Sequence, residues 1–252
     1  MYKRQVQSLA IEQLRRAGAL SSADLLRIYR ESPYGVVRLE ALMALSATPD
    51  DHFITAVTEA SQDAYELVQR QAIRFIAKNG DQRLIPALIR LSIANNTSDR
   101  CNFNVMTALA CFPKEDLLAE FDRQFDAPSV QYLDKNNLRG KIRNTIAHSA
   151  DRLTTDIDKM VKGEASEKDR TFTIRALRNT LPHHKVPELL VYLQDCGDGN
   201  TQILLLEALG WHTVSCHAAD IAATALKMSE DASLPDAVRQ EALKTYRRIH
   251  EK

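Results

Sequence analysis

One phrase recurs along this chain: Val37-Arg38-Leu39-Glu40-Ala41-Leu42-Met43-Ala44-Leu45. Its first position occurs eight times, at Val6, Val37, Val68, Cys101, Leu138, Asp169, Thr201 and Val238, and the seven steps between these positions are 31, 31, 33, 37, 31, 32 and 37 residues. A period of this length is typical of a helical repeat array, because each unit is too small to bury its apolar face and must stack on its neighbours. The repetition predicts an all-α protein in which residues 6–252 form one continuous domain.

The composition agrees with a helical array. Hydrophobic residues make up 44% of the 252 residues and aromatic residues only 6%, with 8 Gly and 8 Pro. Such a chain is rich in helix formers and has enough apolar material for an extended core. The 33 basic and 33 acidic residues cancel, which argues against a protein that coats nucleic acid. No apolar run approaches the roughly 20 residues that span a bilayer.

Each unit is expected to contain two amphipathic helices joined by a short turn. In the first complete unit, residues 19–29 form one helix, capped by Ser21 or Ser22, and residues 36–45 form the second. Gly80 follows a helix and suits the left-handed conformation of a C-cap. Short connections of this kind favour antiparallel neighbours.

Later units follow the same scheme. Further helices are expected at 103–112, 138–146 with 153–161, 172–181 with 186–193, 203–209 with 221–226, and 238–249. The stretch 126–137 is longer and irregular, contains Pro128, and is the best candidate for a bend or a functional insertion.

The recurring phrase resembles that of HEAT repeats, whose second helix reads Val-Arg, then Ala three residues on, then Ala-Leu. Here Val37-Arg38, Ala41 and Ala44-Leu45 carry the resemblance, and Val238-Arg239 with Ala242 repeats it. The Val-Arg pair is lost near Cys101 and Thr201. The resemblance spans nearly the whole chain. It implies a right-handed α-solenoid of about seven antiparallel helix pairs plus a leading half-repeat, and it says almost nothing about function.

The beginning of the chain does not match a complete unit. Residues 1–5 resemble the translation of a sequencing-library adapter and are excluded from fold reasoning as a cloning or sequencing scar. Val6, Ala10 and Leu14 align with Val37, Ala41 and Leu45, so the chain starts directly in a second helix. We therefore expect preceding sequence to be missing, and with it a targeting signal, a membrane anchor or a further domain.

In HEAT-repeat proteins the second helices line the concave surface. Their outward positions here lie three and six residues after the template valine. The candidate partner-binding residues are Glu40, Met43, Gln71, Arg74, Asn104, Thr107, Lys141, Asn144, Arg175, Glu207, Glu241 and Lys244, with Phe172 and Leu204 at equivalent positions. The set is polar and mixed, as on solenoids that hold peptides, although a solvated face would give the same residues.

Charge is unevenly distributed along the chain. Residues 39–68 contain six acidic side chains and no Lys or Arg, whereas residues 135–185 contain twelve basic and six acidic ones. This asymmetry could steer an acidic partner to the second half of the array. Solvated helix faces would explain it equally.

The segment around Trp211 is the densest group of metal-ligand residue types. His212, Cys216 and His217 could meet the ligand preference of zinc, but no second ligand pair stands at the usual spacing. We therefore predict no metal site. The neighbouring pair at 183 and 184 is expected to end a helix in solvent. Trp211 could anchor a partner, but we expect its ring to wedge between adjacent units.

The cysteines and the absence of catalytic motifs limit the function classes. Cys101 and Cys111 lie in apolar helical context and are expected to act as small buried hydrophobes. Four reduced thiols slightly favour a cytoplasmic location. No nucleophile-elbow, phosphate-loop or dinucleotide fingerprint occurs, so no catalytic residue or cofactor is predicted.

These observations favour a monomeric, non-enzymatic scaffold. Its expected partner is a protein or peptide, not nucleic acid. The alternatives are HEAT-like modules associated with enzymes, similar to bilin lyases or DNA glycosylases, or a regulatory part of a larger membrane-anchored protein. A DNA glycosylase would need a basic, aromatic-lined groove. Arg74, Lys141 and Arg175 supply charge, but few aromatic residues accompany them.

Overall fold

The computed structural model describes residues 6, 9–11, 13, 14, 19–97, 103–125 and 135–250. Every regular element in these ranges is a helix, and none of their residues forms a strand. The all-α prediction is confirmed. Residues 1–5, Cys101 and residues 126–134 of the expected bend lie outside the described residues. No helix within the described ranges is both long and apolar enough to cross a bilayer.

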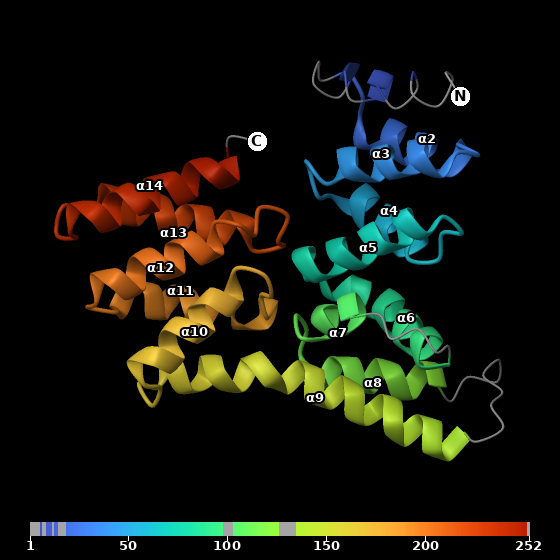
Figure 1. The fold of residues 1–252 in the computed structure, drawn as a ribbon. Helices are drawn as coiled ribbons and strands as arrows, with labels where there is room; N and C mark the ends of the chain where they lie inside the picture. Colours follow the sequence, from blue (N-terminus) through green and yellow to red (C-terminus); the bar gives the residue numbers. More distant parts are fainter. Residues whose placement is uncertain are drawn as a thin grey trace.

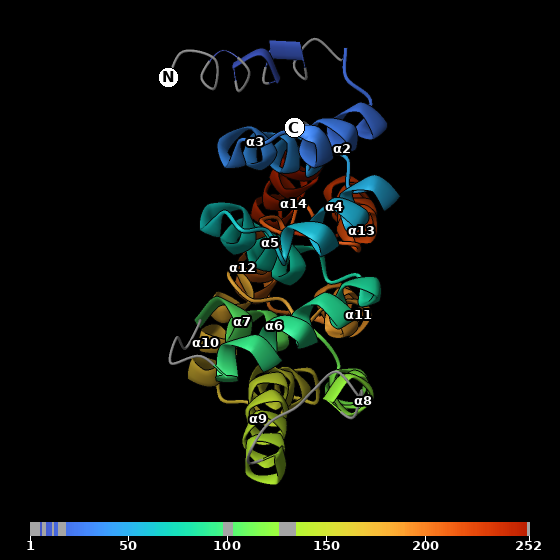
Figure 2. The ribbon, with the colours of Figure 1, turned by 90° about the vertical axis from the view of Figure 1, so that its right-hand side faces the viewer.

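The helices form two layers. The second helices of successive units contact one another in one layer, and the other layer contains contacts between the first helices α2 and α4, α6 and α8, and α11 and α13. Figure 2 shows α3, α5, α7 and α10 on one side, with α2, α4, α8, α11 and α13 on the other. The second-helix layer contains α3 (Gly35–Leu45), α5 (Glu66–Asn79), α7 (Phe103–Leu109), the N-terminal half of α9 (Lys135–Val161), α10 (Glu167–Leu177), α12 (Gly199–Leu209) and α14 (Asp236–His250). The first-helix layer contains α2 (Ser22–Glu31), α4 (Asp51–Ala60), α6 (Ile85–Thr97), α8 (Lys114–Phe125), α11 (Val186–Asp195) and α13 (Ala218–Glu230), with short 3₁₀ helices η1 (Gln82–Leu84) and η2 (His183–Lys185) leading into α6 and α11.

Local sequence signals set the helix ends. The Ser21 hydroxyl accepts a hydrogen bond from the backbone N–H of Asp24, whose carboxylate accepts one from the Ser21 backbone N–H, so α2 begins with a capping box. Gly80 ends α5 with φ of 72°, a conformation that favours glycine. Both expectations are confirmed.

Helix α9 differs from the prediction. Residues 138–146 and 153–161 were expected to form a pair of helices, but they lie in one uninterrupted helix, Lys135–Val161. The segment 147–152 contains neither Gly nor Pro, so nothing in it breaks a helix. The buried stripe also continues in helical phase through Ile142, Ile146, Ala150, Leu153, Ile157 and Met160. One continuous helix therefore replaces the hairpin of this unit.

This continuous helix divides the molecule into two arms. Helices α2–α8 form the N-terminal arm, α9 crosses the base, and α10–α14 form the C-terminal arm, which returns beside the first (Figure 1). Each arm has its own apolar core. One core ends on α9 at Ala150, and the other begins on the same helix at Leu153.

The arms meet through turns that connect successive units. We call this contact the inter-arm clasp, formed by Asn79, Gly80, His183, Ser215 and Cys216. The Asn79 side-chain amide donates to the Val214 carbonyl oxygen at 2.8 Å, and the Cys216 backbone N–H donates to the Asn79 carbonyl oxygen at 2.8 Å. The His183 backbone N–H donates to the Cys111 carbonyl oxygen at 3.1 Å.

The expectation for His183 and His184 was wrong. The His183 side chain is 2% exposed, and its imidazole bonds to the Ala77 carbonyl oxygen and the Ser215 hydroxyl. His184 is half-buried. The pair follows α10 as predicted, but the return of the C-terminal arm places the His183 ring inside the clasp.

Candidate functional site

The twelve candidate binding residues all lie in the second-helix layer, and none of their side chains is fully buried. Six are exposed, namely Met43, Arg74, Lys141, Asn144, Arg175 and Lys244. The other six are half-buried, namely Glu40, Gln71, Asn104, Thr107, Glu207 and Glu241. The template position itself points inward, since Val37, Val68 and Val238 are at most 3% exposed. The three-residue and six-residue offsets therefore reach the outer side of each second helix.

Part of this polar surface is used within the array. The Glu207 carboxylate lies 3.5 Å from Arg178, and the Lys244 ammonium lies 3.1 Å from Glu241. Such exposed pairs add little stability. They leave a surface of mixed charge that spans both arms.

The arginine of the Val-Arg pair has a structural partner. Arg38 donates from two nitrogens to the Asp63 carboxylate at 2.6 and 2.7 Å, and Tyr29 donates to the same carboxylate at 3.1 Å. Burial alone would raise the pKa of Asp63, but the hydrogen bonds from Arg38, the Tyr65 backbone N–H and Tyr29, together with the charge of Arg38, outweigh it and hold the pKa below its usual value. Arg170 and Asp198 repeat this arrangement more loosely at 3.7 Å. Each of these two pairs joins one unit to the next.

Trp211 lies between neighbouring units, but its side chain remains 47% exposed. The guanidinium carbons of Arg178 and Arg248 lie 4.8 and 4.7 Å from its ring centre, within the range of cation–π attraction. The expected wedge is thus only partial. Arg178, Trp211 and Arg248 together form an exposed cationic and aromatic cluster at the ends of α10, α12 and α14.

The arginine neighbours of Trp211 were missed in the sequence. They stand 33 residues before it and 37 residues after it, which is one unit in each direction. The repeat spacing would have indicated that all three side chains lie near the ends of equivalent helices.

The candidate metal ligands point to separate partners. His212 donates from Nε2 to the Leu177 carbonyl oxygen at 2.6 Å, and His217 bonds to the Asp220 carboxylate at 3.1 Å. Burial lowers the pKa of His212, whereas Cys216 is exposed. Among the described residues, no three His, Cys, Asp or Glu side chains are grouped so that they could hold a metal ion.

Cys111 is 1% exposed, and burial raises the pKa of its thiol to about 12. A thiol in this environment stays protonated and packs as an apolar side chain. The expectation of a small buried hydrophobe is confirmed for Cys111.

No protein-family model matches the sequence, and no curated protein is significantly similar to it.

Proposed function

We propose that this protein is a non-enzymatic interaction scaffold of the HEAT-repeat type, whose second-helix layer binds another protein or a peptide. In this proposal the helix pairs form a right-handed α-solenoid that is bent back on itself at α9. The unit spacing, the two layers of helices and the ion pairs between successive units support the assignment.

One observation carries the functional part of the proposal. Beyond the opening segment 6–14, the large hydrophobic side chains that the described residues expose are concentrated on second helices and the turn after α12: Val36, Met43, Leu67, Phe172 and Trp211. In the first-helix layer, the described residues expose one large hydrophobic side chain, Val191 on α11. Exposed apolar and aromatic side chains within a polar surface are typical of the centre of a protein interface.

Site-specific crosslinking tests this proposal. A photoreactive benzoylphenylalanine replaces Met43 or Arg175 in the second-helix layer, and Arg27 or Val191 in the first-helix layer serves as the matched exposed control. After irradiation in cells, we expect covalent adducts with the same partner protein at the first two positions and background labelling at the controls. Equal labelling of both layers, or none at Met43 and Arg175, would contradict the proposal.

A further inference from the structure

The side chains around Trp211 give the second-helix layer of the C-terminal arm an excess of positive charge. Arg178 and Arg248 lie over the indole ring, at 4.8 and 4.7 Å from its centre. Arg175 is exposed one turn before Arg178. The nearby carboxylate of Glu207 lies 3.5 Å from Arg178. Within the described ranges Arg248 pairs with no carboxylate and approaches only a backbone carbonyl oxygen, at 3.5 Å.

The N-terminal arm adds a further cation beside this cluster. Lys78 is exposed at the end of α5 and precedes Asn79, which bonds to the turn after α12 through the clasp. Burial lowers the pKa of His212, the residue after Trp211, and the nearby charge of Lys78 lowers it further. Both arms therefore contribute positive charge to the surface around Trp211.

The groups that meet at the indole are hydrogen-bond donors. Guanidinium groups and the indole N–H donate and do not accept, and the Trp211 N–H bonds to no residue of the described ranges. Contact with the indole also restricts each guanidinium, so that less side-chain entropy is lost when it binds a ligand. A planar guanidinium matches a carboxylate through two parallel hydrogen bonds. The cluster therefore favours a ligand that carries carboxylates.

The spacing of the two arginines indicates the form of this ligand. Both guanidinium carbons lie within 4.8 Å of the same ring centre, so they cannot be more than about 10 Å apart. In an extended chain, alternate side chains point to the same side and are about 7 Å apart along the strand. An extended segment with acidic residues at alternate positions can therefore place one carboxylate on Arg178 and another on Arg248.

A nucleic acid fits the same cluster less well. Proteins bind single strands largely by stacking bases on aromatic rings, but the guanidiniums of Arg178 and Arg248 already lie over the Trp211 ring. Glu207 and Glu241 on the neighbouring helices α12 and α14 would also repel a continuous phosphate backbone. The carboxylates of a peptide can be spaced so that they avoid these two side chains.

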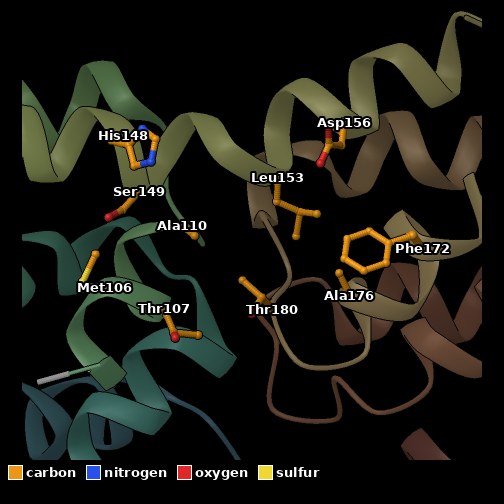
Figure 3. Close-up of a pocket in the computed structure, with 10 residues that line it drawn as sticks. All are labelled: Met106, Thr107, Ala110, His148, Ser149, Leu153, Asp156, Phe172, Ala176 and Thr180. Carbon is orange, nitrogen blue, oxygen red and sulfur yellow. The ribbon is translucent and has the colours of Figure 1, made fainter. Parts of the chain in front are cut away.

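A cavity elsewhere in the second-helix layer does not offer the same charge. It has a volume of about 240 Å³ and lies between α7, α9 and α10 (Figure 3). The Asp156 carboxylate and the His148 imidazole line it, and none of the described residues in its lining is Lys or Arg. Asp156 would repel an acidic chain. The cluster at Trp211 is therefore the better site for such a chain.

We infer that the Trp211 cluster binds an extended acidic segment of the partner protein, with alternate Asp or Glu side chains paired to Arg178 and Arg248. The inference rests on the proposed function, since it names the chemistry of the same partner. Complementary charge of this kind speeds the encounter and fixes the register of the bound chain. The exposed apolar side chains of the layer would supply further contact area.

Binding of synthetic peptides tests the inference without the partner. The probe is a fluorescein-labelled decapeptide of alternating Glu and Ser, and the matched control peptide alternates Gln and Ser. Anisotropy gives the affinity, and the emission of Trp211, the single tryptophan of the chain, reports binding at the cluster. We expect the Glu peptide to change this emission and to bind about tenfold more tightly than the Gln peptide at low salt. Added salt should weaken its binding, because the paired charges are exposed.

Two double variants locate the site. Arg178→Gln with Arg248→Gln should weaken binding of the Glu peptide about tenfold. Arg27→Gln with Arg123→Gln removes the same net charge from the first-helix layer, where both side chains are exposed. This control should leave the affinity within about twofold of the unaltered protein, since charges far from the cluster are screened.

Equal affinity for the two peptides, or equal weakening in the two double variants, would overturn the inference. Tighter binding of a single-stranded oligonucleotide of the same charge would also overturn it, because the cluster would then suit nucleic acid. If Arg178→Gln with Arg248→Gln does not fold, the two peptides and the Trp211 emission of the unaltered protein still decide. A partner crosslinked at Met43 without binding of the Glu peptide would refute the acidic segment alone, so the two proposals fail separately.

Discussion

The imidazole Nε2 of His183 lies 2.9 Å from the carbonyl oxygen of Ala77, a residue 106 positions earlier on the other arm. Because a carbonyl oxygen only accepts, Nε2 carries the hydrogen, and Nδ1 accepts from the Ser215 hydroxyl at 3.0 Å. Both ring nitrogens are thus used by a neutral imidazole. Burial lowers the pKa of His183 to about 3, so protonation would break the clasp.

Stability is expected to fall as the pH is lowered. The unfolded chain takes up a proton on His183 near pH 6.5, whereas the folded protein resists until about pH 3, so stability is lost across this window. From pH 7.5 to 5.0 this linkage amounts to about 2 kcal/mol. Urea unfolding at both pH values should show that His183→Gln loses less unfolding free energy between them than the unaltered protein does, by about this amount.

Replacement of an exposed histidine provides the control. His52→Gln is the reference variant, and His183→Gln should show the smaller pH dependence of the two. Equal pH dependence in His183→Gln and the unaltered protein would show that the clasp imidazole does not control acid stability.

Gly80 and Gly163 form a matched pair for measuring the clasp. Both have positive φ, at 72° and 74°, so alanine at either position meets similar backbone strain of about 1–2 kcal/mol. A Cβ on Gly80 would also lie 2.0 Å from the His183 ring, whereas a Cβ on Gly163 would meet nothing within 4 Å. Thermal and urea unfolding should show Gly80→Ala to be less stable than Gly163→Ala by about 1–3 kcal/mol.

The extra destabilisation of Gly80→Ala should depend on the His183 imidazole. The double variant Gly80→Ala with His183→Ala should therefore lose less stability than the sum of the losses in the two single variants. Additive costs would mean that the ring and the glycine do not share the same space in solution.

The Arg38–Asp63 pair should contribute much more stability than the exposed Arg30–Glu59 pair. The Arg38 and Asp63 side chains are 18% and 5% exposed, compared with 52% and 38% for Arg30 and Glu59. Arg38→Met leaves a buried carboxylate without its main partner and should cost about 1–3 kcal/mol. Arg30→Met should cost no more than about 1 kcal/mol.

A double-mutant cycle with Asp63→Asn would measure the coupling. Asp63 also accepts from Tyr29 and from the Tyr65 backbone N–H, so Asp63→Asn alone should be destabilising. A coupling between Arg38 and Asp63 near zero would contradict the structural role of the motif arginine.

Trp211 offers a fluorescence readout of its two arginines, because it is the single tryptophan of the chain. Iodide should quench it efficiently, since the half-exposed ring lies under the positive charges of Arg178 and Arg248. Arg178→Gln with Arg248→Gln should lower the Stern–Volmer slope for iodide but not for neutral acrylamide. A parallel decrease with both quenchers would show a change of exposure instead of charge.

Periodicity was sufficient to predict much of the fold. Apolar residues at helical spacing identified the helices, and Ser21 and Gly80 marked ends that the structure reproduces. The continuous helix α9 could also have been predicted, since residues 147–152 contain no helix breaker and the stripe from Ile142 to Met160 never leaves phase. The repeat template favoured a turn there and outweighed that local signal.

The contacts between the arms could not be predicted in this way. In the clasp, residues of one arm meet residues of the other arm that are more than one hundred positions away, and this meeting depends on the direction in which α9 leads the chain. A histidine after a helix has the same sequence context whether it meets water or a returning arm. The cavity between α7, α9 and α10 depends equally on that path, because its walls come from both arms.

Helix α9 gives the molecule a mechanical property that a straight array of repeats lacks. Its two halves complete different cores, so fraying at the middle would withdraw apolar surface from both arms at once. In a linear array the end units can open while the centre stays intact. Here the slowest amide exchange is expected along α9, with both arms opening as one cooperative unit around it.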